Sequence, residues 1–439
     1  MRKSSPRSTR SPRERLRNRL GTGHVVAVPR GIALTRLRWA LKQLSERLWV
    51  RAALFALLGV ASALASIVAA PLVPEGVSAK IGADAVDKVL GILASSMLTV
   101  AIFSLSTMVS AYGAAASSAT PRATYLLQAD RGAQNALATF IGAFLFSLAG
   151  IIALSTGIYG SSGRLLLFFV TLVVVAVVVA TFVGWIDALS RLGRMNETID
   201  RVAAAAAEAL DDYALSQTMG AQRARTPPAG ARAITADRTG YLQHVDIAAL
   251  ARLCGDGGEI DVARIPGAFV GRGETLAYAS AFDEERADDI RDAFILGNRR
   301  SFNQDPRFGL IVLSEIASRA LSPAVNDPGT AIDILASLAR LLTRPVREEV
   351  PEPVTNVYVP MLAPRSLLED CIMPIARDGA GMIEVALRLQ RTLATIATNP
   401  RFAEAAHELA GDSRERALAA LPHEMDRQRL RATIAASIA

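Results

Sequence analysis

The stretch LLLFFVTLVVVAVVVATFV, residues 165–183, contains no charged side chain and decides the fold class. Asp, Glu, Lys, Arg and His are also absent from three other runs, 52–74, 89–121 and 132–163. Each run reaches the roughly 20 residues that a helix needs to cross a hydrocarbon core of about 30 Å. The period-two alternation of membrane barrels is missing. We therefore predict a membrane α-helical domain at 53–189, with four transmembrane helices near 53–73, 90–112, 136–159 and 165–189.

The overall composition supports a membrane class. Of the 439 residues, 51% are hydrophobic and 20% are charged, and the mean hydropathy of +0.29 is high for a soluble protein. Such a chain buries too much apolar surface to be disordered along its whole length. Cys254 and Cys371 lie far apart in the sequence, so we expect neither a metal-binding pair nor a disulfide framework. We therefore expect the part of the chain that carries them to lie in the reducing cytosol.

Positive charge is concentrated at the N-terminus. Residues 1–51 contain fourteen Lys or Arg and two acidic residues. Because the whole chain has a formal net charge of +7, the remaining residues have a net charge of −5. The positive-inside rule therefore predicts a cytoplasmic N-terminus, and four spans return the C-terminus to the cytoplasm. We expect a multi-pass protein of the inner cell membrane with the lipid bilayer as its partner. Because the basic excess lies in a tail, no nucleic-acid partner is expected.

Two segments precede the first predicted span. Residues 1–31, rich in Ser, Pro and Arg, are predicted to form a disordered basic tail. This tail either contacts anionic lipid head groups or acts as a topology signal alone, and the sequence leaves both interpretations open. Residues 32–52 carry leucines at helical spacing with basic residues between them, which predicts an interfacial helix.

Small and hydroxyl-bearing residues recur every three or four positions in the predicted spans, which places them on one helix face. They include Thr99, Ser106, Ser110, Thr139 and Ser147. Such a stripe either lines a pore or allows close helix packing, and packing is the preferred interpretation. The absence of carboxylates deep in the spans argues against a proton-coupled carrier. Four such helices form a pore more readily as an oligomer. The sequence therefore leaves a homo-oligomer as one possible assembly.

Beyond the membrane domain we predict a cytosolic α+β domain. Residues 190–240 are predicted as a stalk helix and linker, and residues 241–282 as a small β subdomain. The segment PGAFVGRGETL, residues 266–276, resembles the hairpin of biotinyl- and lipoyl-type barrel-sandwich domains. No lysine follows Lys88, so the cofactor-bearing lysine of those domains has no counterpart. Residues 283–439 are predicted as a mainly helical domain with a strand near 354–362.

Two Asp-Pro pairs, at 305–306 and 327–328, predict a helical hairpin of residues 306–321 and 328–343. An Asp at the N-cap accepts a hydrogen bond from a free backbone N–H, and Pro suits the first helical position. Glu315 and Arg319 are spaced to form an ion pair within the first helix.

The densest polar patch of the sequence surrounds this hairpin. It consists of Arg299, Arg300, Asp305, Arg307, Glu315, Arg319, Asn326, Asp327 and Asp333. The patch is either a ligand or anion site near two helix N-termini or a set of caps and ion pairs. Caps and ion pairs are the preferred interpretation.

No catalytic, cofactor-binding or metal-binding motif is recognised. The sequence has no Gly-Lys pair for a phosphate loop, no Gly-x-Ser-x-Gly elbow and no histidines at metal-ligand spacing. His244 and Asp246 lie two residues apart on a predicted strand, as a base and its orienting group would, but a surface pair is the preferred interpretation. The protein is therefore predicted to lack a cofactor and not to be an enzyme.

The segment RRSFNQDPRFGLIVLSEIASRALSPAVNDPGTAI, residues 299–332, resembles the signature of a bacterial family of predicted membrane proteins, domain of unknown function 2254. Segments 95–122, 128–148 and 266–277 resemble it as well. The resemblance implies four N-terminal spans and a cytosolic C-terminal domain, and it supplies no activity. Family members often carry paired histidines at the end of the fourth span, where this chain has Trp185-Ile186-Asp187, so no role of those histidines carries over.

Two functional hypotheses follow, with an enzyme that rests only on His244 and Asp246 as a distant third. The polar stripes and the charged patch favour a channel or transport-related protein with a cytosolic regulatory domain. The absence of a catalytic constellation favours, as the alternative, a non-catalytic membrane scaffold or regulatory protein.

The predicted orientation can be tested by cysteine labelling. A cysteine that replaces Ser78, in the predicted outer loop, should react with a membrane-impermeant maleimide only from outside the cell. A cysteine that replaces Ser216, beyond the fourth span, should react only from inside. The reverse labelling pattern would contradict the positive-inside argument.

Overall fold

The computed structural model of the protein describes residues 83–438 except 129, 157–160, 192, 216, 256, 283–285 and 345–351, together with isolated positions between Val50 and Ala65. The predicted tail 1–31, the interfacial helix 32–52 and the first span 53–73 lie outside the described residues, apart from those isolated positions.

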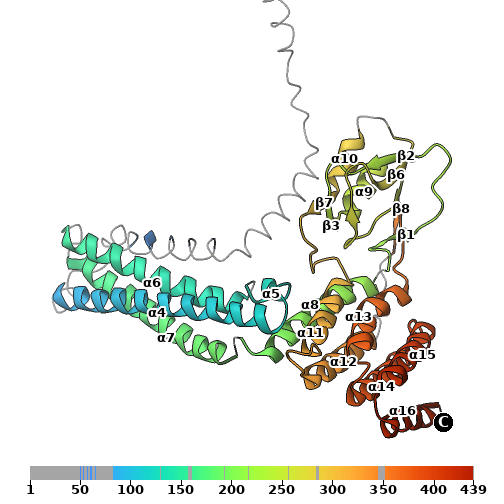
Figure 1. Cartoon of the computed structure of the whole chain (residues 1–439). Helices are drawn as coiled ribbons and strands as arrows, with labels where there is room; N and C mark the ends of the chain where they lie inside the picture. Colours follow the sequence, from blue (N-terminus) through green and yellow to red (C-terminus); the bar gives the residue numbers. More distant parts are fainter. Residues whose placement is uncertain are drawn as a thin grey trace, which may run out of the picture.

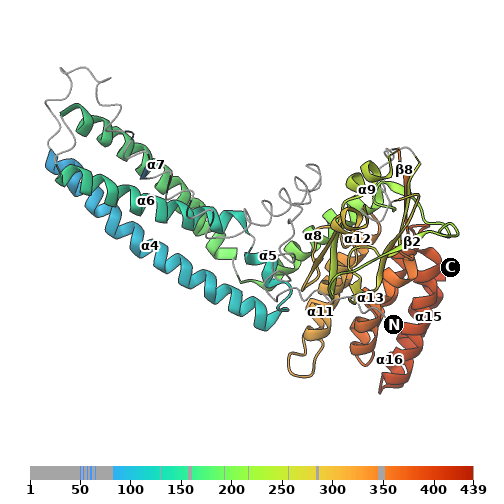
Figure 2. The same cartoon turned by 90° about the horizontal axis from the view of Figure 1, so that it is seen from above.

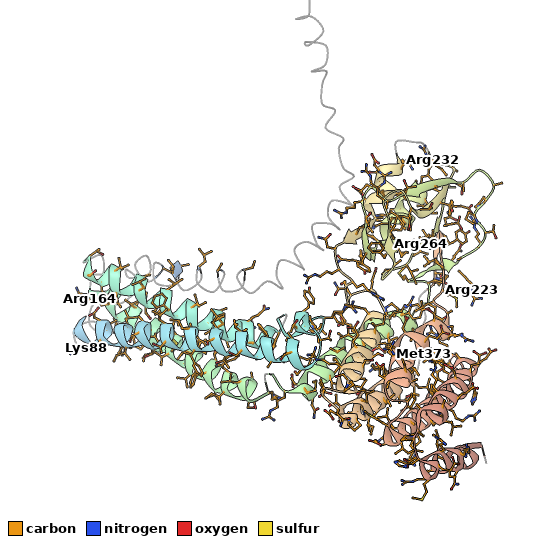
Figure 3. All side chains as sticks on the ribbon, viewed as in Figure 1. Lys88, Arg164, Arg223, Arg232, Arg264 and Met373 are labelled. Atoms are coloured by element: carbon orange, nitrogen blue, oxygen red, sulfur yellow. The ribbon has the colours of Figure 1, made fainter. Side chains whose placement is uncertain are left out.

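Three helices in the described part of the chain are long and apolar enough to cross a membrane. They are α4 (Ala83–Ser118), α6 (Arg131–Ser155) and α7 (Ser161–Arg191), and they correspond to the second, third and fourth predicted spans. They lie side by side as a bundle (Figure 1). Met108, Phe140 and Trp185 are buried where the three helices meet. Lys88 and Arg164 lie at the end of the bundle remote from the C-terminal elements (Figure 3).

The fourth span and the predicted stalk helix after it are two separate helices. α7 ends at Arg191, and α8 (Met195–Leu215) begins after a turn at Gly193. Gly193 has a φ of +82°, a left-handed conformation that glycine adopts without a Cβ penalty. Ala111 of α4 lies 3.6 Å from the position that a Cβ would take. The chain therefore turns at Gly193 while packed against α4.

A helical domain lies at one end of the membrane bundle, with a β-rich part beside it (Figures 1 and 2). The predicted hairpin is confirmed as α11 (Phe308–Ala320) and α12 (Pro328–Leu342). These two helices and α8 share one buried core with three later helices, α13 (Pro364–Asp378), α14 (Ile383–Ala397) and α15 (Ala403–Ala420). α16 (Glu424–Ile438) packs on α14 and α15.

The β-rich part contains two sheets. A five-stranded sheet has the order β1 (Ala221–Arg223), β8 (Val354–Val359), β4 (Glu259–Val262), β6 (Thr275–Ser280), β2 (Arg232–Thr235). A three-stranded sheet has the order β5 (Phe269–Val270), β3 (Gly240–Val245), β7 (Phe294–Gly297). Two short helices, α9 (Ile247–Cys254) and α10 (Ala287–Asp292), complete this part, and α5 (Thr124–Gln128) joins α4 to α6.

Two sequence predictions change in this part. The segment 217–240, predicted as a linker, contributes β1 and β2, the two edge strands of the larger sheet. In the segment PGAFVGRGETL, β5 pairs with β3 while β6 pairs with β2 and β4, so its two strands belong to different sheets.

α8 and α11 make a close helix contact in the helical domain. A Cβ on Gly309 would lie 2.5 Å from the Cβ of Ala206 and 2.8 Å from its Cα. We expect Gly309→Ala to push the two helices apart and to cost about 1–3 kcal/mol of unfolding free energy, the usual range for overpacking. Denaturation of the purified full-length protein in detergent measures this.

The matched control is Gly411→Ala in α15. Apart from the backbone of its own helix and its chain neighbours, nothing lies within 4 Å of the Cβ position there, so the substitution should be neutral or stabilise the protein by up to about 1 kcal/mol. Equal effects of the two substitutions would contradict the proposed helix contact.

Candidate functional site at the membrane junction

The nine residues of the predicted polar patch do not form one site. Glu315 points to the membrane helices and forms an ion pair with Arg122, so the predicted pair with Arg319 is wrong. Arg307 pairs with Asp370 of α13. The carbonyl of Arg299 accepts a hydrogen bond from Gln243 at 2.6 Å. The patch therefore divides into separate structural contacts.

Asp305 was predicted to cap the first hairpin helix, but α11 begins three residues later at Phe308. Its side chain is almost fully buried and accepts hydrogen bonds from Arg300 Nε at 2.7 Å and from the backbone N–H of Arg307 at 3.1 Å. Burial raises the pKa of Asp305, and Arg300 partly offsets this. A Cβ on Gly267, whose φ is +94°, would lie 2.5 Å from the Asp305 carboxylate. Asp305 is therefore packed against Gly267 of the β-rich part while it is bonded to Arg300 and Arg307.

Asp327 is confirmed as the N-cap of α12. Its carboxylate accepts hydrogen bonds from the backbone N–H of Thr330 at 3.1 Å and from the Thr330 hydroxyl at 2.6 Å. These bonds hold the pKa of Asp327 below its usual range. Asn326, just before it, adopts a φ of +50°, and Asp333 accepts a hydrogen bond from Ser337 through its backbone carbonyl.

The predicted hydroxyl stripe does not converge on a common path among the described helices. Thr99, Ser106 and Ser110 are exposed on α4, whereas Ser147 is buried in α6 and Thr139 is half-buried. The hydroxyls of Thr99, Thr139 and Ser147 donate to carbonyls four residues earlier, at 2.8–2.9 Å. Such bonds satisfy a hydroxyl within its own helix.

Two ion pairs instead meet where the membrane helices join the C-terminal domain. Arg122, in the turn after α4, pairs with Glu315 of α11, and the Thr120 hydroxyl donates to the same carboxylate at 3.4 Å. These contacts join positions 193 and 195 residues apart in the chain.

The second ion pair lies at the start of α6. Asp130 caps α6 by accepting a hydrogen bond from Gly132 N–H at 2.9 Å, and its other oxygen accepts one from Arg201 of α8 at 2.9 Å. Arg201 also donates to Glu197 at 2.8 Å. Burial lowers the pKa of Arg201, but the two carboxylates outweigh this and raise it overall. The guanidinium therefore stays charged and holds α6 to α8.

An apolar contact accompanies these pairs. Ala119 and Ala123, on either side of the turn after α4, are buried in the same core as α8 and α11. We name the two ion pairs and these alanines the junction. Through these contacts α8 and α11 are joined to the start of α6 and to the turn after α4.

The remaining predictions from the sequence concern Asp246 and metal binding. Asp246 caps α9 by accepting a hydrogen bond from Ala249 N–H at 2.8 Å. Within the described part of the chain, no group of three or more His, Cys, Asp or Glu side chains is placed to hold a metal ion.

The junction predicts a difference between two arginines. Arg201→Met leaves Asp130 and Glu197 half-buried without their cation, so the free energy of unfolding should fall by about 1–2 kcal/mol, between the values for exposed and buried pairs. Arg191→Met removes an exposed pair with Asp187 and should cost less than about 0.5 kcal/mol. Thermal unfolding in detergent compares the two variants, and equal losses would contradict the role given to Arg201.

Comparisons with known proteins agree with this architecture. The model of the family described as "Predicted membrane protein (DUF2254)" matches residues 45–395. The uncharacterised proteins Rv1290c of Mycobacterium tuberculosis and Mb1321c of Mycobacterium bovis are each 34% identical over 125 residues, which is 26% of this chain. The chain spans 23% of the length of these relatives. No solved structure matches the chain. Because the family model covers far more than half of its length, this protein belongs to the family of predicted membrane proteins named domain of unknown function 2254.

Proposed function

We propose that the protein is a channel or transport-related protein of the inner membrane, regulated by its C-terminal domain. In this proposal residues 53–73 supply a fourth transmembrane helix beside α4, α6 and α7. Both termini lie in the cytoplasm, as the basic residues at 1–51 favour. The lipid bilayer is the partner, and the basic tail contacts anionic head groups.

The junction is the observation that carries this proposal. A regulatory domain acts on a membrane domain only through contacts that favour one arrangement of both. Arg122–Glu315 ties the end of α4 to α11, and Asp130–Arg201 ties the start of α6 to α8. α8 in turn follows α7 after the Gly193 turn. All three described membrane helices therefore have a direct link to the C-terminal domain.

The hydroxyl stripe supports a pore between copies of the chain rather than within one copy. Thr99, Ser106 and Ser110 share the outward face of α4 with large apolar side chains such as Phe103 and Val109. In a homo-oligomer this face would meet a neighbouring copy. The alternative function, a non-catalytic scaffold or regulator, uses the same exposed faces for lipid and partner contacts and needs no conduction.

Flux measurements separate these two functions. Purified full-length protein in liposomes should carry ions across the membrane under a potassium chloride gradient, followed with a potential-sensitive dye. Glu315→Lys should change that flux about fivefold or more, the lower end of typical coupling between sites. Adding Arg122→Glu to this variant restores opposite charges and should bring the flux back towards the unmodified level.

The control is Glu408→Lys, which alters an exposed pair with Arg365 far from the junction and should leave the flux unchanged. If no ion or solute moves under any gradient, the channel function is wrong and the scaffold function remains. If flux occurs and Glu315→Lys leaves it unchanged, the junction does not regulate the flux.

A further inference from the structure

One face of the five-stranded sheet carries an unusual set of polar side chains. Asp261 of β4 is the direct cross-strand partner of Tyr278 on β6 and of Tyr358 on β8. Glu259, two residues before Asp261, is paired with Ser280 on β6. Direct partners and alternate residues share a face of a sheet, so these five side chains lie together. Their neighbours Ile260, Ala279 and Val357 point the other way, into the apolar core beside α9.

A cation from the same chain already contacts this polar face. Arg225 lies on the connection between β1 and β2, which are the two opposite edges of the sheet. Its guanidinium lies over the Tyr358 ring, 3.7 Å from the centroid. It donates to Glu259 at 2.5 Å and to Asp261 Oδ1 at 3.2 Å. These bonds hold the pKa of Glu259 below its usual range.

Arg225 does not satisfy the face completely. Two carboxylates oppose one guanidinium, which leaves a formal charge of −1. The side chain of Asp261 is 5% exposed, yet its Oδ2 atom has no hydrogen-bond partner among the described residues. The hydroxyl of Ser280, on the adjacent strand and the same face, is likewise buried without a partner in this part of the chain. Buried polar atoms are nearly always paired, so two on one face point to a missing donor.

We propose that this face binds a small organic cation through a primary ammonium or guanidinium group that donates to Asp261 Oδ2 and to Ser280 Oγ. Such a group supplies the missing positive charge and the missing hydrogen bonds together. The Tyr358 ring already contacts Arg225, and the Tyr278 ring on the same face suits a second cation, since the faces of aromatic rings attract positive charge. A divalent metal is less suited, because two carboxylates shared with Arg225 offer few free oxygen ligands. This binding activity is independent of whether the protein conducts ions.

Isothermal titration of the purified full-length protein in detergent tests the site, with 1,4-diaminobutane and agmatine as the ammonium and guanidinium probes. We expect saturable binding of at least one probe. Asp261→Asn, which keeps the shape and removes the charge, should weaken that binding about tenfold or more, equivalent to about 1.4 kcal/mol. Ser280→Ala should weaken it less. Asp237→Asn removes an exposed carboxylate elsewhere in the β-rich part and should leave the affinity unchanged.

Three results would overturn the proposal. They are the absence of saturable binding of either amine, undiminished binding by Asp261→Asn, and binding of Ca²⁺ or Mg²⁺ without binding of an amine. Thermal unfolding of each variant shows whether it is folded. If Asp261→Asn does not fold, Ser280→Val decides the question, because it removes the Oγ acceptor and adds bulk on the same face of the sheet, so retained binding would refute the site.

Discussion

A hydrocarbon core offers the peptide backbone no hydrogen-bond partners, and the rest of this structure depends on that constraint. It forces the apolar runs into α4, α6 and α7 and leaves charged groups to gather where those helices end. Asp130 and Arg122 lie at such ends and are therefore free to pair with Arg201 and Glu315 of the C-terminal domain. That domain therefore contacts the membrane helices through these two ion pairs and through the apolar side chains of Ala119 and Ala123.

Much of the fold follows from local patterns in the sequence. The three described membrane helices, the hairpin of α11 and α12, and the Asp327 cap were all predictable, because length, apolar periodicity and Asp-Pro signals act over a few residues. The edge strands β1 and β2 were not. They are three and four residues long and flank Pro227-Pro228, so their strand conformation comes from pairing with β8 and β6 rather than from propensity.

The candidate sites were harder to predict because their residues, too, are paired by the tertiary fold rather than by local sequence signals. Glu315 has a suitable local partner in Arg319, yet it pairs with Arg122 from the end of α4. Asp305 precedes Pro306 as a helix cap would, but its carboxylate is buried against Gly267 and paired with Arg300. Asp261 and Ser280 become neighbours only when β4 and β6 pair. Pairings between distant segments leave no periodic trace in a single sequence, whereas caps and spans do.

The strand order of the larger sheet bears on how the chain is made. β8, at residues 354–359, is inserted between β1 and β4, which the ribosome synthesises about a hundred residues earlier. Until Val359 has emerged, β1 has no neighbour and one side of β4 is an open edge, the kind of surface that invites pairing with other chains. α11 and α12 are completed in that interval. The nascent β-rich part therefore needs protection until translation has passed the hairpin, and a chain released before β8 would expose two unpaired edges beside the membrane.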